Sequence, residues 1–144
     1  MLKQIDFDKD KPEIVPNVSI HDYGCLTISI FNILKRHEIC TKEFTDFLNL
    51  IKTLGGYTKE GLLKWDIIKL LFGVEHRKMK KTDNFKFEDN IEYIVQVPYK
   101  ETGHFCEVKG IKDSNVIVYV DTYDGKTKEI NRNDCISVRE LTVM

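Results

Sequence analysis

The chain has 144 residues, 42% of them hydrophobic, which is enough for one domain to bury a core without disulfide bonds. Its 22 basic and 23 acidic residues give a net charge of −1, so overall charge favours neither nucleic acid nor an anionic membrane as a partner. The polar start does not resemble a signal peptide and no apolar run has the length of a membrane span, which predicts a protein that is cytoplasmic as synthesised.

We predict a single α+β domain over residues 1–144, with helices first and an antiparallel sheet second. Residues 1–20 form an N-terminal arm in which Pro12 and Pro16 discourage a long helix. A helical half follows over 21–73. Its three expected helices run from an N-cap at Asp22 to about 37, from an N-cap at Thr41 to 54, and over 59–72.

The sheet half is predicted over residues 91–144, where the apolar period changes from helical to alternating. Its expected strands are 91–97, 105–111, 116–121 and 136–143. Residues 74–90 between the halves are predicted as a solvated loop. The basic stretch 77–81 inside it is alternatively a binding patch, although no aromatic residues are interleaved with it.

Cys25 is the first candidate for chemistry, because it precedes a helix that is apolar on every side. A thiol in the first turn of a helix lies at the positive end of the helix dipole, which favours the thiolate. The alternative is that Cys25 simply packs in the core, as free cysteines commonly do. The other cysteines, Cys40, Cys106 and Cys135, form no C-x-x-C pair, so neither a zinc framework nor a disulfide scaffold is indicated.

His104 and Asp121 are the second candidate pair, because residues 112–115 have the composition of a hairpin turn. A turn centred near residue 113 would set His104 opposite Asp121 or one place away. With His104 facing Asp121, Cys106 would face Tyr119 and Val108 would face Ile117. An aspartate orients an imidazole, and an imidazolium beside Cys25 would stabilise its thiolate, so Cys25, His104 and Asp121 have the chemistry of a catalytic triad. The alternative is a structural or exposed His–Asp pair. The pairs His21 with Cys25 and His104 with Cys106 also suggest metal binding, but four well-spaced zinc ligands are not evident, and no metal or cofactor is expected.

Several short motifs, in this order and spacing, resemble the papain-like cysteine peptidases that process bacteriocin leaders and their relatives in phage and bacterial cell-wall proteins. The motifs span most of the chain: residues 22–29 (DYGCLTIS), 55–57 (GGY), Trp65, 103–105 (GHF), 120–121 (VD) and 124–125 (DG). The resemblance implies a papain-like fold with Cys25 as the nucleophile, His104 as the general acid/base and Asp121 as the residue that orients it. It also implies cleavage of peptide or amide bonds without a metal or organic cofactor.

One departure from this family concerns the oxyanion hole. The family usually has a glutamine shortly before the cysteine, and residues 16–21 contain none. Gln4, Asn17 and Ser19 remain as alternative donors.

From the candidate triad and the resemblance we expect a cysteine peptidase or amidase. Its expected substrate is a peptide, foremost a peptidoglycan peptide, and the protein would be delivered to the cell wall or carried in a phage virion. The alternative is an inactive papain-like binding domain with a phage structural or host-inhibitory role. Oligomeric state is left open.

Overall fold

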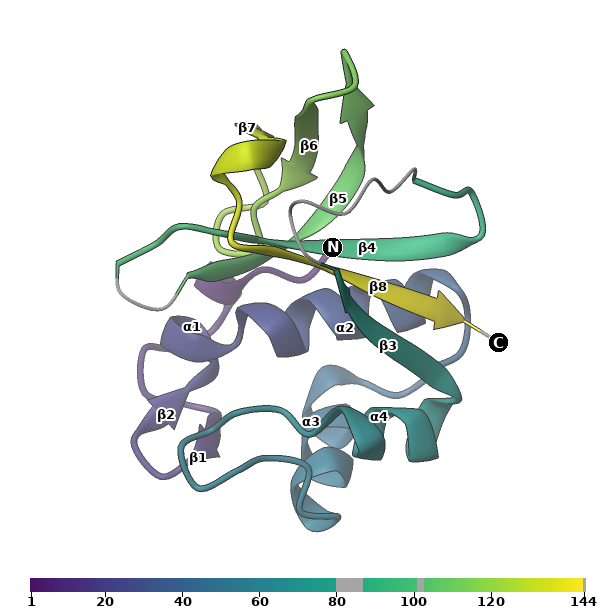
Figure 1. Ribbon diagram of the computed structural model, residues 1–144. Coiled ribbons are helices and arrows are strands. Elements are labelled where there is room, and N and C mark those ends of the chain that lie inside the picture. The colour runs from purple at the N-terminus through teal and green to yellow at the C-terminus, as the bar shows by residue number, and fades with distance from the viewer. Residues whose placement is uncertain (80–86, 101–102, 144) are drawn as a thin grey trace.

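The computed structural model describes residues 1–79, 87–100 and 103–143. It is an α+β structure in which helices lie against one face of a six-stranded antiparallel sheet (Figure 1). This agrees with the predicted fold class and with the order of helices before sheet.

The N-terminal arm contains three short elements before the first helix. A 3-10 turn, η1 (Gln4–Asp6), is followed by β1 (Glu13–Val15) and β2 (Val18–Ser19), which pair with each other as an antiparallel ribbon. Helix α1 (Ile20–Tyr23) comes directly after β2, and Ser19 caps it by accepting a hydrogen bond from the Asp22 backbone N–H.

The helix that carries Cys25 begins later than predicted. Helix α2 is Cys25–Arg36 with Gly24 as its N-cap, so the prediction that Asp22 caps this helix was wrong. Gly24 separates α1 from α2, and only glycine fits at this position, because a Cβ would lie 2.6 Å from the Ile20 carbonyl oxygen. Eight consecutive residues of α2, 27–34, are buried, which confirms that this helix is enclosed on all sides.

Helices α3 and α4 also begin later in the sequence than predicted. Helix α3 (Phe44–Thr53) has Glu43 rather than Thr41 at its N-cap, and α4 (Trp65–Phe72) begins six residues after position 59 because Tyr57 and Leu63 form a β-bridge. Helix α4 ends as expected at Gly73, which adopts the left-handed conformation. None of the helices in the described residues has the length and apolar character to cross a membrane.

The sheet contains two strands that sequence patterning did not find. Its strands are β3 (Val74–Met79), β4 (Ile91–Val97), β5 (His104–Lys112), β6 (Val116–Val120), β7 (Thr127–Asn131) and β8 (Ser137–Val143), in the order β3-β8-β4-β5-β6-β7. The predicted loop over 74–90 was therefore wrong at its start, since β3 pairs with β8 at the sheet edge. Part of the basic stretch, Arg77 to Met79, lies on β3, and its lysines 80 and 81 are outside the described residues.

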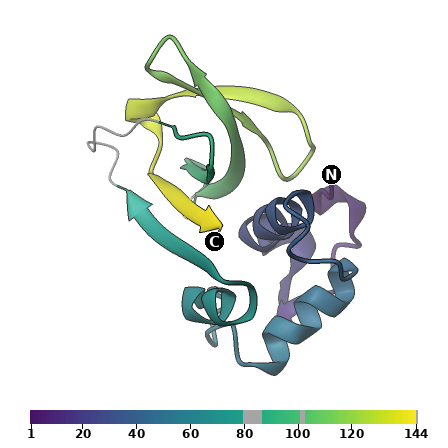
Figure 2. The ribbon, with the colours of Figure 1, turned by 90° about the vertical axis from the view of Figure 1, so that its right-hand side faces the viewer.

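A separate hydrophobic core lies against each face of the sheet. One core lies between the sheet and the helices and includes Phe47, Ile33 and Ile94. The other lies within the curve of the sheet and includes Val95, Cys106 and Tyr119. A view turned by 90° shows β5, β6 and β7 curling away from the helices while α2 stays against the sheet (Figure 2). Strand β5 contributes to both cores, because its successive side chains point to opposite faces.

Candidate functional site

Cys25 is the first residue of α2 and lies against the start of β5. The backbone N–H of Phe105 donates a hydrogen bond to Cys25 Sγ at 3.4 Å. Cys25 is half-buried, whereas Cys40, Cys106 and Cys135 are buried. The thiol therefore has solvent access at the place where the helix layer meets the sheet.

His104 and Asp121 are in direct contact, although the predicted register was wrong. His104 Nε2 and Asp121 Oδ1 are 2.7 Å apart. Strand β5 contains a bulge between Val108 and Gly110, and Val108 lies opposite Tyr119 rather than Ile117. The turn is centred at residue 114 rather than near 113, since Lys112 pairs with Val116, and the bulge changes the register by one position. His104 extends beyond the end of β6 to reach Asp121, which follows that strand.

The imidazole of His104 also contacts two thiols. Cys106 Sγ lies within 4.8 Å of a ring nitrogen, and both Cys106 and Cys25 are near enough to affect the protonation of the ring. Because Nε2 is bound to Asp121, Nδ1 is the ring nitrogen that remains for sulfur. Burial lowers the pKa of His104, but the hydrogen bonds and negative charge of Cys106 and Cys25 outweigh that effect and raise the pKa to about 11. The site therefore stabilises an imidazolium between sulfur and carboxylate.

The carboxylate of Asp121, which follows the end of β6, accepts three hydrogen bonds. Its Oδ1 accepts from His104 and from the Tyr123 backbone N–H at 2.8 Å, and its Oδ2 accepts from Lys128 Nζ at 2.6 Å. Burial raises the pKa of Asp121, but the bonds from Lys128 and His104 outweigh it and hold the pKa below its usual value. Asp121 is thus an ionised acceptor with a fixed orientation.

Of the three candidates for an oxyanion donor, Gln4 already has its side-chain donors engaged. Gln4 is buried, and its Nε2 donates to the carbonyls of His21 at 2.9 Å and Ile20 at 3.4 Å, so both amide hydrogens are used. Ser19 Oγ accepts the cap bond of α1, which leaves its O–H as a donor, and in Asn17 it is the backbone N–H that donates to Glu13, not the side-chain amide. Among the described residues, the backbone N–H of Cys25 is a further donor, because the first N–H groups of a helix have no intrahelical acceptor.

The same cluster offers ligand atoms to a metal ion. One atom each from His104, Cys106 and Asp121 lies within 4.8 Å of the others. However, Cys106 is fully buried, and both oxygens of Asp121 are occupied, one of them by the ammonium of Lys128. A cation would have to displace Lys128 and break the His104–Asp121 bond, so the residues suit acid–base chemistry better than metal binding. His21, the other histidine considered as a metal ligand, contacts Asp22 Oδ1 through its Nδ1 at 2.8 Å.

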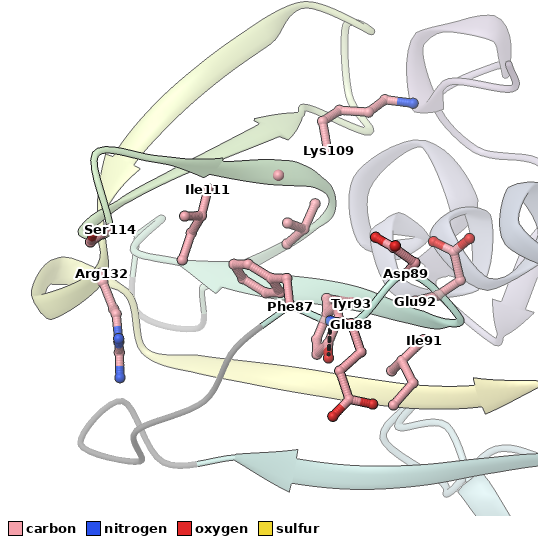
Figure 3. Close-up of a pocket in the computed structure, with 12 residues that line it drawn as sticks. Phe87, Glu88, Asp89, Ile91, Glu92, Tyr93, Lys109, Ile111, Ser114 and Arg132 are labelled. Carbon is pink, nitrogen blue, oxygen red and sulfur yellow. Dashed lines mark hydrogen bonds between the residues drawn. The ribbon is translucent and has the colours of Figure 1, made fainter.

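A hollow of about 700 Å³ lies elsewhere, between β5 and the segment Phe87–Tyr93. Its charged side chains, including Glu88, Lys109 and Arg132, point in different directions (Figure 3). Inside it, the Glu88 backbone N–H donates to the Tyr93 hydroxyl at 3.1 Å. Binding sites normally have polar groups that converge on one point, so this hollow is a weaker candidate than the Cys25 cluster.

Sequence reasoning missed the groups that surround the triad. Neither Cys106 nor Lys128 was predicted as a partner of the His104–Asp121 pair. His76 is half-buried, with its ring stacked on Trp65 at 3.8 Å. In the motif Gly55-Gly56-Tyr57, the hydroxyl of Tyr57 lies 2.7 Å from Thr27 Oγ1 in the first turn of α2. Each of these contacts joins residues far apart in sequence, and only the motif carried a signal.

In comparisons with known proteins, the sequence matches no family model and no curated protein significantly.

Proposed function

We propose that the protein is a cysteine peptidase or amidase of papain-like fold, with Cys25 as nucleophile, His104 as general acid/base and Asp121 as the residue that orients His104. One observation carries the proposal: a single imidazole is bonded to Asp121 through Nε2 at 2.7 Å and also contacts the half-buried thiol of Cys25 at a helix start. This is the relation that nucleophile, base and orienting acid require.

In the proposed reaction, the Cys25 thiolate attacks the carbonyl carbon of the scissile amide. The His104 imidazolium protonates the leaving amine, and an acyl-enzyme remains on Sγ. Water then attacks the acyl carbon while His104 takes its proton, which releases the acid and restores the thiolate. The Cys25 backbone N–H stabilises the oxyanion, since donors at a helix start carry partial positive charge. Asp121 keeps Nδ1 directed at sulfur.

Exposed aromatic rings support a peptide as the substrate. Tyr23 precedes Cys25 by two residues, Tyr123 follows Asp121 by two, and Tyr99 lies 5.7 Å from the ring of His104; all three are exposed. Large amphipathic side chains around a reactive group are typical of surfaces that bind peptides. Peptidoglycan peptide remains the first substrate to test, on the strength of the sequence resemblance.

The test is the alkylation rate of each cysteine by iodoacetamide between pH 5 and 9, followed by mass spectrometry. Selectivity for Cys25 alone is insufficient, because the other three thiols are buried. We expect Cys25 to be alkylated rapidly already near neutral pH, because an adjacent imidazolium favours the reactive thiolate. His104→Ala should slow this reaction at neutral pH.

The matched control is His37→Ala, which removes an imidazole that contacts Glu92 at 2.7 Å on the surface. It should leave the Cys25 profile unchanged. A Cys25 that is inert, or that reacts identically without His104, would contradict the proposal and favour the alternative, an inactive domain that binds a partner. Hydrolysis of peptidoglycan fragments and of peptide libraries, with Cys25→Ala as the inactive variant, then identifies the substrate.

A further inference from the structure

Arg139 is a partly buried cation that is connected to Cys25 through Phe105. It lies on β8 directly opposite Lys78 of β3 and Ile94 of β4, so these side chains share the sheet face that α2 covers. Its guanidinium lies over the ring of Phe105, 5.5 Å from the ring centroid, and the backbone N–H of Phe105 donates to Cys25 Sγ. One residue of β5 therefore connects Arg139 with the thiol.

The contacts of Arg139 are all with uncharged groups. Its Nε donates to Ser137 Oγ at 3.3 Å and its Nη1 lies 3.2 Å from His76 Nε2. Burial lowers the pKa of His76 to about 4, with the charges of Arg139 and Lys78 acting in the same direction, so this ring is neutral and accepts the hydrogen bond. Among residues 1–79, 87–100 and 103–143, no carboxylate bonds to Arg139.

Arg36 provides the comparison on the same face of the sheet. It contacts Glu107 at 3.1 Å and Glu92 at 3.0 Å, and although burial lowers its pKa, the bond with Glu107 and these charges raise it. For Arg139 burial lowers the pKa and nothing offsets it. A desolvated cation without a counter-charge is costly, so such a group is more typical of a binding site than of a structural ion pair.

Arg139 is also held in a fixed orientation. Ser137 Oγ receives its Nε–H and in turn donates to Gln96 Oε1 at 2.7 Å, while His76 is stacked flat on Trp65. A guanidinium has five N–H donors, and these contacts use two of them. The remaining donors suit bidentate binding of a carboxylate.

We propose that Arg139, assisted by Lys78, binds a free carboxylate of the substrate near the scissile bond. This inference rests on the proposed function, because it takes Cys25 as the point of attack. It narrows the substrate class to peptides with an acidic side chain or a terminal carboxylate within a few residues of the cleaved bond.

The test uses alkylating probes, so that no substrate needs to be known. Cys25 is treated with N-iodoacetyl derivatives of glycine, β-alanine and 4-aminobutyrate, each as the free acid and as the uncharged amide, at low ionic strength. We expect one chain length to react about 5- to 10-fold faster as the acid, the effect of one partly exposed charged hydrogen bond. The acid-to-amide ratio cancels changes in the reactivity of the thiol itself.

Arg139→Gln should remove the preference for the acid. Arg77→Gln is the matched control, because it also removes one guanidinium but from the face of the sheet opposite to Arg139. There Arg77 lies on β3 and contacts Glu140 at 3.0 Å, so this variant should keep the preference for the acid. Lys78→Gln is a second variant, which should lower the preference partly and guards against misfolding of Arg139→Gln. An equal ratio in wild type and Arg139→Gln overturns this inference alone. A Cys25 inert to acids and amides overturns the proposed function as well.

Discussion

The imidazole of His104 lies between a carboxylate, which contacts one ring nitrogen, and two cysteine side chains on the side of the other nitrogen. Asp121 fixes Nε2, and two sulfur atoms, of Cys25 and Cys106, lie on the other side. Only Cys25 has solvent access, because Cys106 is fully buried in the core within the curve of the sheet. Cys106 is therefore suited to adjust the protonation of His104 without meeting a substrate.

Replacing Cys106 by alanine should lower the pKa of His104 from about 11, because a hydrogen bond and a negative charge that raise it are removed. NMR titration of the His104 ring measures the shift. The variant should also lose about 1–2 kcal/mol in free energy of unfolding, the usual cost of removing a buried side-chain atom. Cys135→Ala removes another buried thiol, one that donates to the Arg132 carbonyl, and should leave the titration of His104 unchanged. An identical His104 titration in all three proteins would exclude a role for Cys106.

The residues of the triad were predictable because each carries a local signal. Cys25 begins an apolar helix, and His104 and Asp121 flank a hairpin whose turn composition is plain in the sequence. Their exact register was not predictable, because neither the centre of the turn at residue 114 nor the bulge between Val108 and Gly110 has a clear sequence pattern. Cys106, Lys128 and Arg139 were missed as partners, because their contacts depend on that register and on strand order.

At the level of elements, η1 connects the two parts of the chain that carry the candidate site. The amide of Gln4 donates to the His21 and Ile20 carbonyls in α1, and its backbone N–H donates to the Thr122 carbonyl, next to Asp121. The side-chain oxygen of Gln4 is buried and has no hydrogen-bond partner in the part of the chain that the structure describes. The N-terminal arm thus ties the segment before Cys25 to the segment after Asp121.

Gln4→Leu should lower the free energy of unfolding by about 1–2 kcal/mol, because two backbone carbonyls lose their hydrogen-bond donor. Removal of the buried side-chain oxygen of Gln4 offsets part of that loss. The alkylation rate of Cys25 should fall as well, since α1 loses its connection to the arm. Gln4→Glu should cost more, because a carboxylate would face two carbonyl oxygens. Ile5→Ala, at an exposed neighbour in the same turn, is the control. Unchanged alkylation in Gln4→Leu would show that the arm does not position Cys25.

Helix α2 contacts the sheet near its C-terminal end through an ion pair in which the carboxylate is buried and the guanidinium is partly exposed. Glu107 of β5 is almost fully buried and accepts from Arg36 at 3.1 Å and from Asn32 at 3.3 Å. Arg36→Met should cost about 1–3 kcal/mol in free energy of unfolding, because it leaves a buried carboxylate without its cation. Adding Glu107→Gln should make the double variant more stable than the sum of the single changes predicts. Chemical denaturation of the four proteins measures the coupling, and strict additivity would contradict it.

The starts of helices were less predictable than their ends. Gly73 ends α4 through a conformation that glycine favours, which its sequence position indicates directly. The start of α4 depends instead on the bridge between Tyr57 and Leu63, a contact that competes with helix formation and that no periodicity reveals. Strand β3 was missed for a related reason: it is an edge strand with exposed charges at Glu75, Arg77 and Lys78, a pattern that also fits a loop.

Over the whole molecule, the candidate site lies where the two cores meet. Phe105 belongs to the core under the helices and Cys106 to the core within the curve of the sheet, so β5 passes between them just after His104. Cys25 comes from the helix layer, and His104 and Asp121 come from the sheet. The site can form only when both cores are packed, which links the protonation of the triad to the stability of the folded chain.

This linkage predicts how stability depends on pH. The pKa of Asp121 is lowered from 3.8, so its contribution is present above that value and is lost as pH falls through the folded-state pKa. The pKa of His104 is raised from 6.5 to about 11, so its contribution is complete below 6.5 and declines as pH rises toward 11. The combined contribution should therefore be greatest between about pH 4 and 6.5.

The measurement is urea unfolding of the wild type and of the double variant His104→Gln, Asp121→Asn across pH 3.5 to 10. Other ionisable groups are common to both proteins, so the difference in free energy of unfolding isolates the pair. We expect that difference to shift by about 1–3 kcal/mol in favour of the variant between pH 6 and 10, and in the same direction below pH 4. A difference that does not vary with pH would mean that the His104–Asp121 pair has the same protonation in the folded and unfolded chain, and that the imidazolium assigned to the folded site does not form.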